Sequence, residues 1–183
     1  MNTVQNSSQF GSRQRGFTLI EVLIAGLVLS VGVLGVAGMQ VTALKNLQSS
    51  QSYGVAAMLA NDIADRMWVN QAQALANVYN HTEAPVGPPD CVTGTCTAAQ
   101  MASFDINDWQ QQIVGYTLVD ATVIPGLLAA GTGTVQLAPV QPAVGTKFDI
   151  ILRWDDDRSG STDTTCPAID ADDLDCYTLS ITL

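Results

Sequence analysis

Four cysteines are the side chains whose chemistry is plainest in this sequence. They form two close pairs, Cys91 with Cys96 and Cys166 with Cys176. Close pairs indicate local disulfides made in an oxidising compartment, and although the sequence leaves the connectivity open, proximity favours pairing in sequence order. A zinc site needs tighter CxxC-type spacing and usually histidine, whereas the single histidine here is His81. We therefore predict two disulfides rather than a zinc centre.

A second group of ligand-type side chains lies in the acidic stretch DDDRSGSTDTTCPAIDADDLDC, which ends at the last cysteine. Four of them match positions one, three, five and nine of a calcium-binding loop: Asp155, Asp157, Ser159 and Asp163. The twelfth position holds Cys166 in place of the bidentate Glu that calcium prefers, and no helices are expected on either side. The expectation is a solvated acidic loop without a cofactor, and calcium binding is the alternative.

Two functional classes fit this sequence poorly. An enzyme is not predicted, because the only histidine, His81, lies in a Pro-rich segment and no nucleophile motif accompanies it. Nucleic acid is not an expected partner either, because 17 Asp and Glu outnumber 7 Lys and Arg and give a net charge of -10. Binding to nucleic acid depends on basic side chains that neutralise phosphates, and this chain has no basic stripe.

An apolar run near the N-terminus is long enough to cross a membrane as a helix. The run 22–39 contains eighteen residues without a charge, and a helix of about 20 apolar residues spans a bilayer core of about 30 Å. The basic residues Arg13 and Arg15 precede it, so the positive-inside rule places the first residues in the cytoplasm and sends the rest of the chain across. Removal of these two arginines with a leader would change the net charge from -10 to -12.

The string RGFTLIEVLIAGLVLSVGVLG resembles the class III signal of type IV prepilins and type II secretion pseudopilins. The resemblance implies that prepilin peptidase cuts after Gly16 and methylates the new amino-terminal Phe17. It also implies that Glu21, at the fifth mature position, pairs with the positive amino terminus of a neighbouring subunit and guides assembly. On physical grounds alone, an ionisable group in a membrane segment costs about 2.5 to 3.5 kcal/mol, so Glu21 either has such a role or is hydrated at the interface.

The expected fold is α+β: a long helix packed on a small antiparallel sheet. Apolar residues recur at three, four or eight residue steps beyond the membrane segment, which predicts that the helix continues as an amphipathic one. A disulfide-held loop and a shorter helix with Asn107 as its N-cap and Trp109 as an anchor should follow. The predicted organisation is a leader at 1–16, a membrane and filament-core helix at 17–40, an amphipathic helix at 41–78, and a head at 79–183 with a loop at 80–97 and a helix near 107–120.

Three segments near the C-terminus alternate apolar and polar residues with a period of two. They contain Val135 and Leu137, the run 148–154, and the run 177–183. This alternation predicts strands with one buried face, joined as an antiparallel sheet that lies on the long helix.

Several other strings resemble the PilV group of minor pilins, the type IV pilus modification proteins. They are ADRMWVNQ in the long helix, the DW of the second helix, FDIILRWDD and CYTLSITL. The resemblance implies a low-abundance pilin that joins other minor pilins to prime pilus assembly near the filament tip. The implied partners are prepilin peptidase, minor and major pilins, the inner-membrane assembly platform and, before assembly, the lipid bilayer. The head would be periplasmic and later displayed on a Gram-negative cell surface. A minor pseudopilin and a calcium-dependent adhesive head are the alternatives.

Substitution of the cleavage-site glycine tests the processing assignment. We expect Gly16→Val to leave unprocessed protein in the membrane, because the resemblance assigns cleavage to the bond after this glycine. The measurement is the molecular mass of the membrane-associated protein, compared with that of the wild type. Mature protein of normal size from the variant would contradict the assignment.

Overall fold

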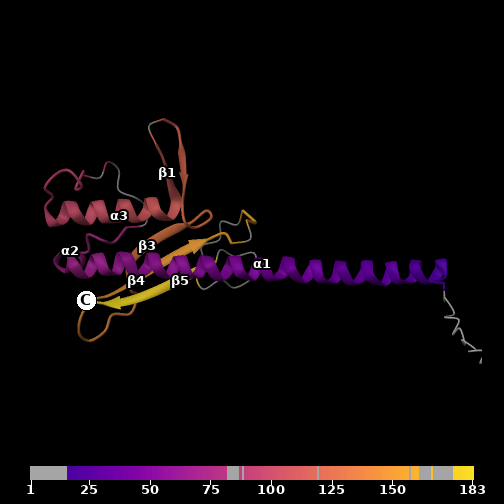
Figure 1. The fold of residues 1–183 in the computed structure, drawn as a ribbon. Coiled ribbons are helices and arrows are strands. Elements are labelled where there is room, and N and C mark those ends of the chain that lie inside the picture. Colours follow the sequence, from indigo (N-terminus) through magenta and orange to yellow (C-terminus); the bar gives the residue numbers. More distant parts are fainter. Residues whose placement is uncertain are drawn as a thin grey trace, which may run out of the picture. The chain divides into compact units, whose positions relative to one another are not determined.

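The computed structural model describes residues 16–81, 87, 89–118, 120–156, 158–160, 166 and 175–183. Contacts divide the chain into two compact units, Met1–Lys45 and Asn46–Leu183. The first helix, α1 (Leu19–Val69), contributes residues to both. The helices and strands of the chain are drawn in Figure 1.

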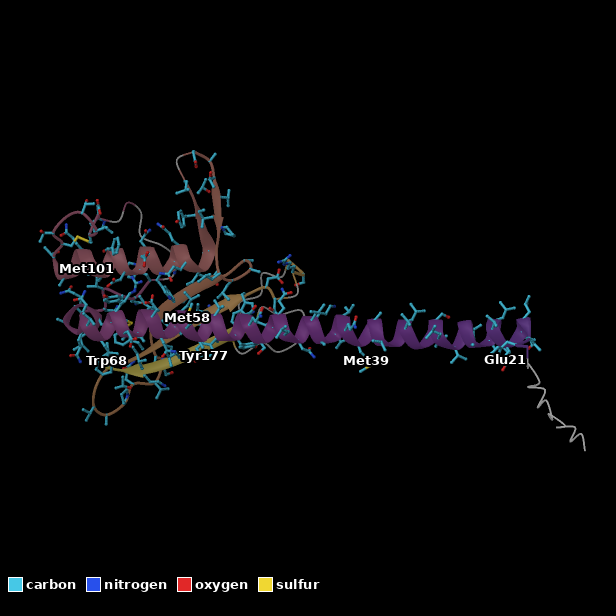
Figure 2. All side chains as sticks on the ribbon, viewed as in Figure 1. Glu21, Met39, Met58, Trp68, Met101 and Tyr177 are labelled. Atoms are coloured by element: carbon cyan, nitrogen blue, oxygen red, sulfur yellow. A yellow bond between two sulfur atoms is a disulfide. The ribbon has the colours of Figure 1, made fainter. Side chains whose placement is uncertain are left out.

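The first unit consists, in its described part, of the start of α1 and the residues just before it. Every side chain from 16 to 45 is exposed, including the large apolar ones. Among the described residues, α1 is the one helix long and apolar enough to cross a membrane, judged by length and composition. Glu21 and Met39 mark this segment in Figure 2. Because exposed apolar surface is unfavourable in water, this helix requires lipid or other helices around it.

In the second unit, α1 acquires a buried face. The buried residues recur three or four positions apart: Ala56, Leu59, Ala60, Ile63, Ala64 and Met67. This is the amphipathic pattern predicted from the sequence. The helix is interrupted at Asn70 and followed by the short α2 (Gln71–Leu75). Asn77 then adopts a positive φ of 64°, which asparagine tolerates better than most residues and which ends the helical segment.

The next helix, α3 (Ala98–Val114), begins earlier than the sequence pattern predicted. Its N-cap is Thr97, whose hydroxyl accepts from the Gln100 amide at 3.3 Å while the Gln100 side chain accepts from the Thr97 amide at 2.9 Å. This reciprocal capping box satisfies two free amide donors at the helix start. The prediction that Asn107 is the N-cap was wrong, because that residue lies inside a helix already begun at the capping box.

A two-stranded antiparallel hairpin replaces the predicted end of this helix. Its strands are β1 (Gly115–Thr117) and β2 (Val123–Pro125). The helix cannot continue because Gly115 has a φ of 89°, which is favourable only for glycine. In the turn, the Asp120 carboxylate accepts from the Thr122 amide at 3.0 Å, a local bond typical of aspartate in turns.

The main sheet contains the three predicted strands, β3 (Thr132–Leu137), β4 (Lys147–Trp154) and β5 (Asp175–Thr182). They are antiparallel in the order β3-β4-β5, so β4 is central. The register places Ile150 of β4 between Val135 and Leu179. Figure 1 shows α3, the second half of α1 and this sheet gathered in one head. The predicted α+β class is confirmed.

One hydrophobic core joins α1, α3 and the inner face of the sheet. Its largest fully buried side chains include Trp109, Trp154, Tyr79, Phe148, Leu59 and Ile63. The predicted anchor Trp109 is fully buried, and its indole nitrogen donates to the Leu59 carbonyl at 2.9 Å. Most buried indoles have such an acceptor, and this bond helps to set the position of α3 on α1.

Two glycines in the second unit allow a matched test of this packing. A Cβ at Gly133 would lie 2.4 Å from the Ile113 side chain and 2.6 Å from the Trp109 ring, whereas at Gly54 it would meet nothing within 4 Å. We expect Gly133→Ala to destabilise the head by about 1 to 3 kcal/mol through overpacking. Gly54→Ala should stabilise it by up to about 1 kcal/mol, because alanine is the better helix former. Thermal unfolding of the full chain in detergent measures both, and equal effects would contradict the packing of α3 on β3.

Candidate functional site

The processing signal lies immediately before the first turn of α1. Gly16 and Phe17 are exposed, Phe17 by 82%. Thr18 starts the helix: its carbonyl accepts from the Glu21 amide at 3.1 Å and its hydroxyl from the same amide at 3.4 Å. The peptide bond between Gly16 and Phe17 is therefore exposed and lies outside the helical hydrogen-bond ladder.

Glu21 lies in the first turn of α1, as labelled in Figure 2. A carboxylate there is favoured by the positive end of the helix dipole. Thr18 and Glu21 have capping-box spacing, but the structure shows only the bond from the Glu21 amide and not the reciprocal bond from its carboxylate. Within the part of the chain that is described, Glu21 forms no ion pair.

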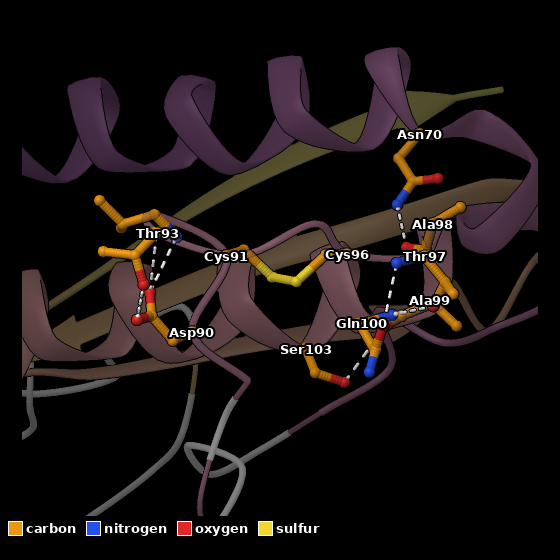
Figure 3. The surroundings of a disulfide bond; sticks show 11 residues. Asn70, Asp90, Cys91, Thr93, Cys96, Thr97, Ala98, Ala99, Gln100 and Ser103 are labelled. Atoms are coloured by element: carbon orange, nitrogen blue, oxygen red, sulfur yellow. Dashed lines mark hydrogen bonds between the residues drawn. A yellow bond between two sulfur atoms is a disulfide. The ribbon is translucent and has the colours of Figure 1, made fainter.

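The first disulfide joins Cys91 to Cys96, with the Cα atoms 5.5 Å apart (Figure 3). Asp90 organises the turn within it, because one carboxylate oxygen accepts from the amides of Val92 at 3.0 Å and Thr93 at 3.1 Å. Its other oxygen accepts from the Thr93 hydroxyl. The hydroxyl bond first, and then the amide bonds, lower the pKa of Asp90 below its ordinary value. The disulfide between Cys91 and Cys96 therefore closes a small, locally ordered loop just before α3.

The second disulfide joins Cys166 to Cys176 at the start of β5, with the Cα atoms 5.9 Å apart. The pairing is the sequential one favoured by the sequence. The Cys166 sulfur also lies 3.4 Å from the hydroxyl oxygen of Thr178. A disulfide that closes about ten residues contributes on the order of 2 to 3 kcal/mol in the chain-entropy picture.

Two side chains of α1 bind the flanks of the acidic stretch. The Ser52 hydroxyl donates to Asp156 at 2.9 Å, and the Tyr53 hydroxyl donates to Asp175 at 3.1 Å. The Tyr53 ring also meets Trp154 edge-on, with centroids 4.8 Å apart. Partial burial, followed by the hydrogen bond to Asp175, raises the pKa of Tyr53. Both ends of the stretch are thereby held against the same helical turn.

The predicted calcium ligands do not meet as a described cluster. Asp155 is 7% exposed, and its two oxygens accept from the Ser159 amide at 3.0 Å and the Gly160 amide at 2.9 Å. Asp157 and Asp163 lie outside the described residues. Over the described ranges, no group of three or more His, Cys, Asp or Glu side chains is arranged to hold a metal. Calcium binding stays a prediction, and the observed role of Asp155 is to stabilise a turn.

His81 lies at the start of the loop predicted at 80–97, but its backbone pairs with β3. Its amide donates to the Val135 carbonyl at 3.1 Å and its carbonyl accepts from the Val135 amide at 3.1 Å. The side chain is half-buried. The reason is that the chain after α2 runs beside β3 and forms a one-residue β-bridge before entering the loop.

An ionic cluster around Arg66 connects α1 to α3. The guanidinium lies 3.1 Å from Asp62, 3.4 Å from Asp105 and 2.7 Å from Asp108. The Tyr79 hydroxyl donates to the buried Asp105 at 2.6 Å. Burial acts to lower the pKa of Arg66, but the bonds to Asp108 and Asp62 outweigh it and raise the pKa. Burial and the bond to Asp105 also raise the pKa of Tyr79.

The sequence places Asp62 and Arg66 one helical turn apart, but it did not predict the partners of Arg66 on α3. Asp105 and Asp108 are one turn apart, and this spacing was the only available signal that both carboxylates share a helix face. Asp105 and Asp108 lie about forty residues after Arg66 in the sequence, so no local pattern predicted that they contact it.

Comparisons with protein families account for the N-terminal half of the chain. The prokaryotic N-terminal methylation motif matches residues 11–37. The type IV pilin Tt1218 family model matches residues 38–107. The chain is a type IV prepilin with a class III signal. The searches of curated proteins and of solved structures gave no match.

The two matches divide the prepilin between its signal and its head. The methylation motif covers Gly16, Phe17, Glu21 and the exposed apolar part of α1 as far as Ala37. The Tt1218 match covers the buried part of α1 and α3 as far as Asn107. A prepilin with this motif is a substrate for prepilin peptidase and assembles with other pilins, and the signal and helix fit an inner-membrane anchor. Pilin domains are structural, which is consistent with a protein that is not an enzyme.

The Arg66 cluster leads to a test of how α3 is held. Arg66→Met keeps most of the side-chain volume but leaves the buried Asp105 with an uncompensated charge. Removal of one partner from a fully buried pair costs about 3 to 5 kcal/mol, so for this half-buried arginine we expect about 2 kcal/mol. Chemical denaturation of the full prepilin in detergent measures the loss.

The matched control is Arg158→Met. Arg158 is exposed and forms no ion pair with the described residues, so its replacement should change the free energy of unfolding by less than about 0.5 kcal/mol. Equal stabilities of the two variants would show that the cluster does not hold α3.

Proposed function

We propose that this prepilin is a minor pilin of the PilV group, which joins other minor pilins in a complex that primes type IV pilus assembly. The observation that carries the proposal is the meeting of two strings that resemble PilV. Arg66, from ADRMWVNQ, binds Asp105 and Asp108, from the helix that contains the DW pair. Trp109 of that pair donates to the Leu59 carbonyl. The segments that resemble PilV therefore contain residues that hold α3 against α1.

In this proposal, the exposed apolar part of α1 is the segment that passes from membrane to filament core. All of its described side chains up to Lys45 are exposed, so neighbouring pilin helices can cover them after they leave the bilayer. Glu21 would pair with the methylated amino terminus of Phe17 on a neighbouring subunit. The penalty of about 2.5 to 3.5 kcal/mol for a carboxylate within a membrane makes this pairing favourable, since it removes an uncompensated charge.

The proposed location follows from the signal and the cysteines. The leader at 1–16 would remain cytoplasmic until cleavage, the segment 17–40 would anchor the protein in the inner membrane, and the segments 41–78 and 79–183 would lie in the periplasm. The oxidising periplasm suits the two disulfides. The assembly platform, other minor pilins and the major pilin are the proposed partners. The mature head would lie near the tip of the pilus on a Gram-negative surface.

A head without a cofactor is the simplest form of this proposal. Both carboxylate oxygens of Asp155 already accept backbone amides, so calcium would have to compete with these bonds. A minor pseudopilin of a type II secretion system remains the alternative, because it shares the signal and the apolar helix.

The decisive experiment counts surface pili and measures secreted proteins in a strain that lacks this gene. Wild type, Glu21→Ala and Glu21→Gln are restored in parallel, and the last variant removes the charge with little change in size. We expect the deletion to lose most pili while secretion continues. Wild type should restore the pili, and both variants should fail although their mass shows normal cleavage after Gly16. Intact pili with failed secretion would assign the protein to the pseudopilins.

A further inference from the structure

The two outer edges of the three-stranded sheet differ in how their backbone groups are used. On β3, the Val135 amide and carbonyl bond to His81, and the Gly133 carbonyl accepts from the Gln110 side chain at 2.7 Å. These contacts cover the outward-facing peptide groups in the middle of β3. A further strand cannot add at this edge without displacing them.

Over the described residues, the β5 edge has no pairing partner at Thr178, Ser180 and Thr182. Thr146 and Leu183 exchange two backbone bonds of 2.9 and 3.0 Å, which fixes the phase of the ladder between β4 and β5. Antiparallel pairing alternates, so every second residue before Leu183 bonds to β4 and the residues between them direct their amides and carbonyls outward. In the described part of the chain, no bond to these outward peptide groups is present.

The composition of β5 leaves this edge without the usual protection. Exposed edges are normally blocked by lysine, proline, bulges or inward-pointing charges, and none occurs from Cys176 to Thr182. The inward-facing side chains of β4 are fully buried: Phe148, Ile150, Leu152 and Trp154. Those of β5 are only partly buried: Tyr177, Leu179 and Ile181. Tyr177 is labelled in Figure 2. One more strand beside β5 would supply the missing apolar cover.

The charges at one end of the sheet indicate which residue a partner strand should carry there. Asp175 begins β5, and Asp156 follows β4 at the same end of the sheet. Ser52 and Tyr53 fix both carboxylates in place. A strand that reaches this end meets two negative groups, which favours a basic residue there and disfavours an acidic one.

We propose that the β5 edge accepts an extended strand from an unlike pilin head. This strand would have alternating apolar residues and a basic residue facing Asp156 and Asp175. It would bond to the outward peptide groups of Thr178, Ser180 and Thr182, in the manner of β-augmentation. The identity of the partner as another pilin rests on the proposed function, whereas the chemistry of the edge does not.

The test uses fluorescein-labelled peptides and the full prepilin in detergent. One peptide alternates threonine and valine over about eight residues, a usual strand length, with lysine at both ends, and the other has glutamate at both ends. We expect the lysine peptide to bind at least about tenfold more tightly, a difference that corresponds to about 1.4 kcal/mol. Fluorescence polarisation measures both affinities.

A matched pair of variants separates the edge from the rest of the strand. Ser180→Pro removes an outward amide and should leave the ladder with β4 intact, because proline is tolerated at solvent-facing edge positions. Ser180→Ala is the control, since both variants lose the bond from the Ser180 hydroxyl to Asp149 at 2.6 Å. The proline variant should bind the lysine peptide at least about tenfold more weakly, whereas the alanine variant should match wild type.

Amide hydrogen exchange locates the bound peptide. Exchange at Thr178, Ser180 and Thr182 should slow when the lysine peptide is added, while exchange at Leu179, already bonded to β4, should not change. Equal binding by wild type and Ser180→Pro, or equal affinity for the two peptides, would overturn the proposal. If the wild type self-associates and Ser180→Pro abolishes this association, the occupant of the β5 edge is a second copy of this chain and not a strand from an unlike pilin head.

The cellular readout distinguishes this proposal from the assignment as a minor pilin. Loss of pili in the Ser180→Pro strain, with normal cleavage and piliation of the Ser180→Ala strain, supports both. If the gene deletion leaves pili intact while peptide binding follows the expected order, the function as a minor pilin is wrong and the edge site stands. If the deletion loses pili but the peptides fail to bind, the edge site alone is wrong.

Discussion

The structure depends on one constraint: a single helix, α1, has to satisfy two different surroundings. Up to Lys45 all of its described side chains are exposed and most are apolar, while from Ala56 to Met67 one face is fully packed in the head. Burial of each large aliphatic side chain stabilises by about 1.5 to 3 kcal/mol, and the first part of α1 gains none of this within the monomer. Lipid or other helices have to supply it, so this part of α1 is stabilised only by surroundings outside the monomer.

The head is oriented on α1 by a few directional bonds spread over four turns of the helix. Ser52 and Tyr53 bind the flanks of the acidic stretch, Leu59 accepts from Trp109, and Arg66 binds the carboxylates of α3. Apolar contacts alone would permit the sheet and α3 to slide, because hydrophobic burial is not directional. Each polar bond fixes one position along the second half of α1, and together they set the register of the sheet and α3 on that part of the helix.

The sequence predicted those features that depend on local periodicity. The alternation in 148–154 identified β4 because a strand with one buried face shows its pattern within eight residues. The start of α3 was missed, since Thr97 and Gln100 form their capping box at the end of a segment rich in Pro, Gly and Thr. The Arg66 cluster was missed because its members come from α1 and α3. Three-residue strands such as β1 carry too few residues for any periodicity.

The acidic composition has a partly structural origin. Asp90 and Asp155 accept backbone amides in turns, and Asp105 is bound by Tyr79 and Arg66. These carboxylates serve the fold, so the net charge overstates what a partner meets. Asp156 is different, because a carboxylate can accept about four hydrogen bonds and the bond from the Ser52 hydroxyl uses one of them. It is therefore held in position while still able to accept from a lysine or arginine, as a recognition group at this end of the sheet requires.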